Sequence, residues 1–281
     1  MTGEAGRVAV AGVQIGARLG DVEGNVERLL DGVRKAVAAG AHLAVLPETI
    51  TSGYLFESWD EAAAAARPID GDEVGSVATA AAELGVHVVF GLLERDGKHI
   101  YNTAVLVGPS GLLGRYRKRH LPFLGLDRFV DKGDDQEAAV FATPLGRVGL
   151  AICYDIRFPE SARCLALRGA DVIAQPSVWP ASVDIIANHM VRVRAAENHV
   201  FLVAVTRGDV EAGVQYRGNS QIVDPRGEIL AWAEQGDAII TAEVDLRFAA
   251  QKKIVVRPGE YEVSLFEDRR PHAYRAITQS S

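Results

Sequence analysis

Short apolar runs rich in β-branched residues alternate with segments of helical periodicity along most of the chain. A run of this kind predicts a strand, whereas apolar residues spaced three and four apart predict a helix. Strands are therefore predicted over residues 8–16, 42–48, 86–94, 146–153, 171–177, 200–205 and 238–246. Helices are predicted over residues 22–37, 72–84, 159–169 and 183–198. Turns with Pro-Ser-Gly and Asp-Pro-Arg-Gly predict hairpins over 103–118 and 219–233.

This alternation indicates an α/β protein. Strands that are apolar along their whole length must be covered on both faces. Helices, strands and several hairpins together predict one mixed sheet, or two sheets, covered by helices. The sequence contains no linker, low-complexity segment or repeat, so we expect one domain over residues 1–281.

Composition narrows the classes of partner. The net charge of -7 argues against a broad electrostatic grip on nucleic acid or an anionic membrane surface. No apolar run reaches the length of a membrane span, and the sequence shows no signal peptide. The two cysteines, Cys153 and Cys164, do not make a disulfide framework. We therefore expect a cytoplasmic protein that acts on a small molecule and whose Cys153 is free to react.

Three reactive side chains stand where predicted apolar strands end. Glu48 ends LAVLPE, Lys118 ends LLGRYRK and Cys153 ends GLAIC. Because ligands of open α/β sheets bind at the carboxyl ends of strands, the three side chains can meet at one edge. Each also has an ordinary structural explanation: Glu48 as a turn carboxylate, Lys118 as a solvated cation and Cys153 as a small core residue.

A carboxylate, an ammonium and a thiol make chemical sense together. A free thiol has a pKa of about 8.5, so it needs a base to attack a carbonyl at neutral pH. Glu48 can take that proton, and Lys118 can stabilise the oxyanion that forms. The backbone N–H of Tyr154 is the second candidate donor to that oxyanion.

Three segments resemble, in order, the motifs of the nitrilase superfamily of carbon–nitrogen hydrolases: LPETITSGY (46–54), YRKRHLP (116–122) and AICYDIRFPE (151–160). Further segments resemble other parts of the same family: 101–111, 175–180, 193–205 and 218–230. The resemblance covers a core of about residues 7–250 and leaves 251–281 as a C-terminal tail.

The resemblance implies a four-layer α-β-β-α sandwich that pairs into a homodimer or a larger homo-oligomer. It implies that Glu48 is the general base, Lys118 the stabiliser of the tetrahedral intermediate and Cys153 the nucleophile. Attack on an amide carbon then gives a thioester and releases ammonia or an amine, and water hydrolyses the thioester. No metal or organic cofactor is implied.

The segment LPFLGLDRFVDKGD (121–134) departs from the family pattern. Many members carry a second glutamate there, which helps to position the substrate and the lysine. Asp127 is the nearest candidate, about one residue out of register and one methylene shorter. Since a misplacement near 1 Å can cost ~10²-fold in rate, efficiency and substrate range are open.

The substrate class is the least determined feature. CYDIRFPE resembles the amidase-like branches, so amide hydrolysis is preferred over nitrile hydrolysis; the range is a small aliphatic amide, an ω-amide or a carbamoyl amine. Four aromatic residues are candidates to line the pocket: Tyr54, Phe123, Tyr154 and Trp179. Arg157 can bind a substrate carboxylate, or form a salt bridge with Asp155 or Glu160.

Two other interpretations stay open. One is a glutaminase-like hydrolase with His199 as base, and the other is a non-catalytic binding protein on the same fold, suggested by the missing glutamate. A metal site is not expected, because His120, His189 and His199 do not pair at ligand spacing. No Gly-x-Gly-x-x-Gly follows a strand, which argues against a dinucleotide enzyme.

Overall fold

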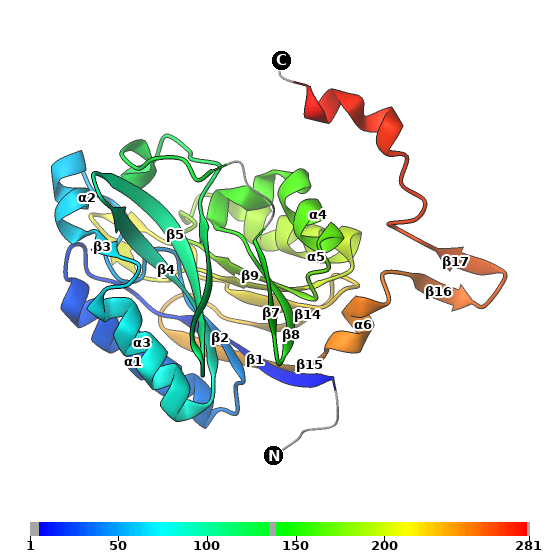
Figure 1. Ribbon diagram of the computed structural model, residues 1–281, viewed down its shortest axis with the longest axis horizontal. Helices are drawn as coiled ribbons and strands as arrows, with labels where there is room; N and C mark the ends of the chain where they lie inside the picture. Colours follow the sequence, from blue (N-terminus) through cyan, green and yellow to red (C-terminus); the bar gives the residue numbers. More distant parts are fainter. Residues whose placement is uncertain (1–5, 135–138, 280–281) are drawn as a thin grey trace.

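The chain folds into two facing β-sheets, each covered by helices on its outer face (Figure 1). This computed structural model describes residues 6–134 and 139–279. The domain expected over 1–281 thus includes residues 1–5, 135–138 and 280–281, which lie outside the described residues. The order of layers is helix, sheet, sheet, helix, so the predicted four-layer sandwich is confirmed.

The first sheet has seven strands and is covered by helices α1 (Val22–Ala38) and α3 (Asp72–Leu84). Three neighbouring strands of this sheet pair in parallel, and antiparallel partners extend it on both sides. In spatial order its main path is β15 (Ala238–Asp245), β1 (Arg7–Gln14), β2 (Leu43–Val45), β4 (His87–Asp96), β5 (His99–Gly108) and β6 (Gly111–Arg117). Beside β4 lies β3 (Arg67–Pro68), and α2 spans Trp59–Ala65.

The second sheet has six strands and is covered by helices α4 (Pro159–Leu167) and α5 (Val191–Asn198). Its order is β14 (Ile229–Trp232), β13 (Gln221–Val223), β10 (Phe201–Val205), β9 (Val172–Pro176), β8 (Gly146–Leu150) and β7 (Val140–Thr143). Strands β8, β9 and β10 run parallel. The smaller elements are η1 (Gly125–Arg128), η2 (Cys153–Arg157), the π-helix η3 (Ile186–Met190), β11 (Val210–Glu211), β12 (Val214–Gln215) and α6 (Leu246–Ala250).

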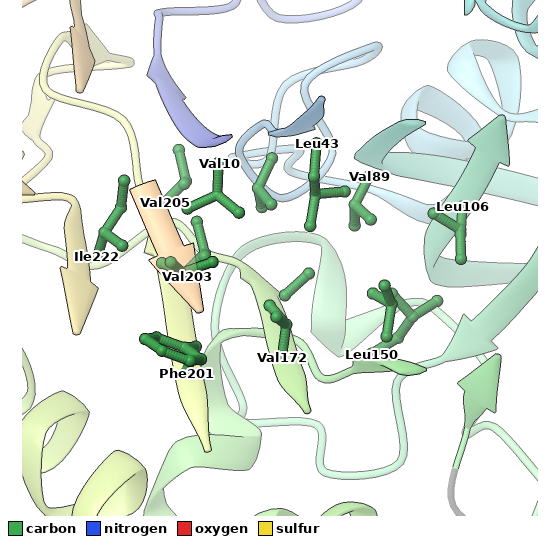
Figure 2. Close-up of a cluster of buried hydrophobic side chains, with 14 of the residues drawn as sticks. Val10, Leu43, Val89, Leu106, Leu150, Val172, Phe201, Val203, Val205 and Ile222 are labelled. Atoms are coloured by element: carbon green, nitrogen blue, oxygen red, sulfur yellow. The ribbon is translucent and has the colours of Figure 1, made fainter. Parts of the chain in front are cut away.

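The largest apolar core fills the space between the two sheets (Figure 2). Val10, Leu43 and Val89 come from the first sheet, and they face Leu150 and Val203 of the second. Because successive side chains of a strand point to opposite faces, the other residues of these strands pack against the helices. The central strands β2, β9 and β10 are thereby buried on both faces, which explains why they are apolar along almost their whole length.

The tail leaves the body after α6 (Figure 1). It forms a two-stranded hairpin, β16 (Ile254–Arg257) with β17 (Tyr261–Val263), and a last helical segment, η4 (Pro271–Thr278). Val255, Val256 and Tyr261 of the hairpin are exposed. No helix among residues 6–134 and 139–279 is long and apolar enough to cross a membrane.

Most predicted elements are present, and most of their ends differ by one or two residues. The helix predicted over 183–198 is irregular: the π-helix Ile186–Met190 precedes α5. The strands predicted over 42–48 and 146–153 stop at Val45 and Leu150. In both cases the chain leaves the sheet while its residues are still buried, so burial alone made the strands look longer than they are.

Candidate active site

Glu48 lies on the turn after β2, three residues beyond the end of the strand. Its side chain is fully buried. The turn can approach β4 closely only because residue 91 is glycine: a Cβ there would lie 2.0 Å from the backbone nitrogen of Thr49. The Gly91 N–H also donates to the carbonyl of Pro47, at 3.1 Å. Packing of backbone on backbone therefore fixes the glutamate.

Lys118 follows the last residue of β6, and its ammonium binds two carboxylates. Nζ lies 2.6 Å from Glu48 Oε1 and 2.5 Å from Asp127 Oδ2. All three side chains are fully buried. The Lys118 N–H donates to the carbonyl of Asn102 on β5, which continues the strand pairing by one residue and sets the lysine's direction.

Asn102 is a member of this cluster that the sequence interpretation missed. Its Nδ2 donates to Glu48 Oε1 at 2.6 Å and to Asp127 Oδ1 at 2.9 Å. The sequence feature that pointed to Asn102 is its position in YNTAVLVGPSG (101–111), a segment that resembles a hairpin of the family. As a single amide in an apolar strand, it carries no signal by itself.

Asp127 reaches the lysine although it is shorter than glutamate. It lies in η1, and the Tyr54 hydroxyl donates to its Oδ2 at 2.9 Å. Gly125 allows the loop to press on the Tyr54 ring, since a Cβ at residue 125 would lie 2.4 Å from Cε1 of that ring. A tightly packed loop thus makes up for the missing methylene.

Cys153 is the first residue of η2 and has a left-handed backbone, with φ of 42°. Such a conformation is uncommon for a residue other than glycine, so the surroundings must hold it. The Asp155 carboxylate accepts the N–H of Ile152 at 2.8 Å and contacts His120 Nδ1 at 2.5 Å. Gln175 Nε2 donates to the Cys153 carbonyl at 3.1 Å. Asp155 therefore joins the thiol turn to the loop that follows Lys118.

The electrostatics of the site follow from burial and from an excess of negative charge. Burial raises the pKa of Glu48; Lys118 opposes this shift and Asp127 adds to it. Burial would lower the pKa of Lys118, but Asp127 and Glu48 raise it well above its usual value.

The thiol is held in its protonated form. Burial and the neighbouring Glu48 carboxylate raise the pKa of Cys153 well above its usual value, while Lys118 and a hydrogen bond from the Val178 backbone oppose the shift. These causes also show that Cys153 lies beside Glu48 and Lys118. The three predicted residues, distant along the chain, are therefore brought together in one cluster, in which Glu48 and Lys118 are fully buried and Cys153 is half-buried.

The remaining predicted residues differ in their placement. Tyr54 and Trp179 are buried, and each belongs to an apolar cluster against which Cys153 packs. Tyr154 is half-buried, with its ring edge-on to Phe158 at 5.2 Å. Phe123 is 91% exposed, so in this structure it lines no buried pocket.

The structure also shows the surroundings of Arg157 and His199, whose roles the sequence left open. Arg157 is exposed and makes no salt bridge within residues 6–134 and 139–279, because Asp155 is engaged by His120 and Ile152. His199 caps the C-terminus of α5 with its ring edge-on to Phe248, and burial and Lys252 lower its pKa. Its carbonyl accepts from Lys252, and none of its described contacts is with Cys153, which argues against a Cys/His hydrolase. Among the described residues, no group of three His, Cys, Asp or Glu side chains is arranged to hold a metal ion.

Comparison with known proteins defines the family. Residues 7–253 match the carbon–nitrogen hydrolase family. The chain is 37% identical to a nitrilase of Pyrococcus abyssi, over 95% of this chain and 99% of that protein. It is 30% identical to an omega-amidase of Homo sapiens, over 95% of this chain and 96% of that protein. The chain therefore belongs to the carbon–nitrogen hydrolase family and is a hydrolase of carbon–nitrogen bonds other than peptide bonds.

Solved structures share the fold. A double mutant of the amidase from Nesterenkonia sp. AN1, determined in complex with acrylamide, superposes with a TM-score of 0.80 at 22% identity, over 99% of both chains. Another structure of that amidase shows covalent addition of the acetamide moiety of fluoroacetamide at its active-site cysteine.

Proposed function

We propose that the protein is a cysteine-dependent amidase that hydrolyses small amides through a thioester on Cys153. The observation that carries the proposal is the buried contact of Lys118 with both Glu48 and Asp127 beside the Cys153 thiol. Removing one ammonium and two carboxylates from water costs free energy that their mutual attraction does not fully recover. Such a cluster is therefore better explained by a role in catalysis than by a contribution to stability.

The reaction needs a proton to move as the bond forms. Glu48 accepts the thiol proton while the sulfur adds to the amide carbon, because the raised pKa of Cys153 disfavours a free thiolate. The Lys118 ammonium and the Tyr154 N–H donate to the resulting oxyanion. The C–N bond then breaks, and protonated Glu48 returns the proton to the leaving ammonia.

Water completes the cycle. Glu48 removes a proton from a water molecule that attacks the thioester, and the carboxylic acid leaves as the thiol is restored. Asp127 and Asn102 hold Lys118 and Glu48 in place during both halves. Tyr54, Tyr154 and Trp179 are the proposed walls for the acyl group. No step in this scheme uses a cofactor.

A small aliphatic amide, an ω-amide or a carbamoyl amine is the proposed substrate range. It is supported by relatives described as an omega-amidase and, at 35% identity, an (R)-stereoselective amidase of Pseudomonas sp.. The relative described as a nitrilase keeps small nitriles as the alternative substrate.

The test is an ammonia-release screen over these amides, carbamoyl amines and nitriles. Cys153→Ala should abolish release, because no other group can form the thioester. Cys164→Ala is the matched control: this thiol is exposed, and its loss should leave turnover unchanged. Full activity of Cys153→Ala on every substrate of the parent protein would refute the proposal.

We also propose that the chain assembles as a homodimer or a larger homo-oligomer in the cytoplasm. The isolated hairpin β16–β17 exposes Val255, Val256 and Tyr261, and a two-stranded hairpin is only marginally stable alone in water. Two free cysteines suit a reducing compartment. Light scattering on the full chain tests the assembly, and a monomer at every concentration would contradict it.

A further inference from the structure

We propose that Glu211 is a positioning residue of the active site, which fixes Tyr54 and Tyr216 relative to each other and so shapes the acyl-binding side. The inference rests on the proposed function, because it assumes that the acyl group of an amide binds beside Cys153. Glu211 ends β11, and its side chain is only 3% exposed.

One carboxylate oxygen of Glu211 accepts three hydrogen bonds. Oε2 accepts from the backbone N–H groups of Tyr54, at 3.0 Å, and Leu55, at 2.8 Å. It also accepts from the Tyr216 hydroxyl, at 3.0 Å. Residue 53 must be glycine for this fit: its φ is +81°, and a Cβ there would lie 2.6 Å from Glu211 Oε1. A single carboxylate thus ties one tyrosine by its main chain and the other by its side chain.

Both tyrosines border the catalytic cluster. The Tyr54 hydroxyl donates to Asp127, which binds Lys118. Tyr216 packs with Tyr54 in the apolar cluster against which Cys153 also packs. Burial raises the pKa of Tyr216, and the negative charge of Glu48 is among the further causes, which places the phenol near the general base. A shift of Glu211 is therefore transmitted to both rings.

The negative charge of Glu211 is compensated by Arg207, whose guanidinium also lies over the Tyr216 ring, 4.7 Å from its centroid. Its Oε1 binds Arg207 Nη1 at 2.6 Å, and the guanidinium is fully buried. Asp209 binds the same guanidinium through both oxygens, at 2.9 and 2.7 Å. The Asp209 main-chain carbonyl accepts the N–H of Tyr216 at 2.9 Å, a bond that substitution of the side chain leaves in place. The Asp209 carboxylate itself shares the ion pair of Glu211 but makes no described hydrogen bond to Tyr54, Leu55 or Tyr216.

This difference makes Asp209→Asn a matched control for Glu211→Gln. Glutamine has one carbonyl oxygen and one NH₂, so in either orientation the NH₂ faces hydrogen-bond donors: those of Tyr54, Leu55 and Tyr216, or the Arg207 guanidinium. The carboxamide must therefore shift, and we expect the two tyrosines to shift with it. Displacements near 1 Å change rates by ~10²-fold. We expect Glu211→Gln to lower kcat/KM for butyramide and to change the ratio of kcat/KM between butyramide and acetamide at least tenfold. Asp209→Asn should leave that ratio unchanged.

The ratio separates positioning from plain loss of folded protein, which would lower both rates equally. Tyr216→Phe removes a single hydrogen bond and serves as a second variant if Glu211→Gln does not fold. An unchanged ratio in both variants, or an equal change in Asp209→Asn, would overturn the inference.

A binding measurement keeps this inference distinct from the proposed function. Acetamide and butyramide should protect Cys153 from alkylation by iodoacetamide in a Cys164→Ala background, and mass spectrometry gives the protection constants. Ammonia release absent from the parent protein would refute the proposed function alone. The ratio of protection constants would still decide the role of Glu211, with an unchanged ratio counting against it.

Discussion

Replacing Asp127 by Asn removes one of the two negative charges that surround Lys118 while keeping the shape of the side chain. Asp127 and Glu48 bind the same ammonium at 2.5 and 2.6 Å, so the two bound oxygens lie no more than about 5 Å apart. The charge of Asp127 is one of the causes that raise the pKa of Glu48. Its removal must therefore lower that pKa.

The size of the shift follows from Coulomb's law. Two unit charges about 5 Å apart interact by ~3 kcal/mol at an effective dielectric constant of about 20. This energy exceeds the ~1.4 kcal/mol that corresponds to a tenfold change in an equilibrium constant, so the fall in the pKa of Glu48 should be visible in a pH profile. The Lys118 ammonium also loses a partner, and a misplacement near 1 Å should lower kcat by ~10²-fold.

The assay is the pH dependence of kcat/KM for a small amide, which reports the ionisation of the free enzyme. Glu48 must be unprotonated to act as base, so its lowered pKa moves the acid limb of the Asp127→Asn profile to lower pH. Asp127→Glu is the control: it keeps the charge, so its acid limb should stay near that of the parent enzyme. An acid limb of Asp127→Asn that is unmoved, or moved to higher pH, would refute the reasoning.

Three further changes test other parts of the structure. His120→Phe keeps an aromatic ring but removes the contact with Asp155, which joins the Cys153 turn to the loop after Lys118. In steady-state kinetics kcat should fall at least tenfold with little change in KM, and an unchanged kcat would contradict this. Gly91→Ala puts a Cβ 2.0 Å from the backbone nitrogen that follows Glu48, so activity should fall ~10²-fold; a parent-like rate would exclude the close packing. Burial lowers the pKa of Lys252 from 10.5 to about 8, so between these pH values the unfolded chain binds the proton that the folded chain has released. The free energy of unfolding should therefore rise with pH across this window in urea titrations, and Lys252→Met should lose that rise.

The local pattern of apolar residues predicted most helices and strands correctly, but it predicted the residues at which they end less well. The helix predicted over 72–84 coincides with α3. The strand predicted over 146–153 stops at Leu150, although Ile152 beyond it is still buried in the core between the sheets. Periodicity reports burial, and residues just beyond a strand can be buried as deeply as those within it.

The sequence alone determined the α/β class, the order of most elements and three motifs around Glu48, Lys118 and Cys153. These depend on residue types and on short spacings, which are visible in one dimension. Only the tertiary structure decided that Asp127 reaches Lys118, that Asn102 binds Glu48 and Asp127, and that Glu211 binds Tyr54 and Tyr216. Hydrogen bonds between distant segments, and the pKa shifts that burial causes, depend on distances in space that the order of residues does not record.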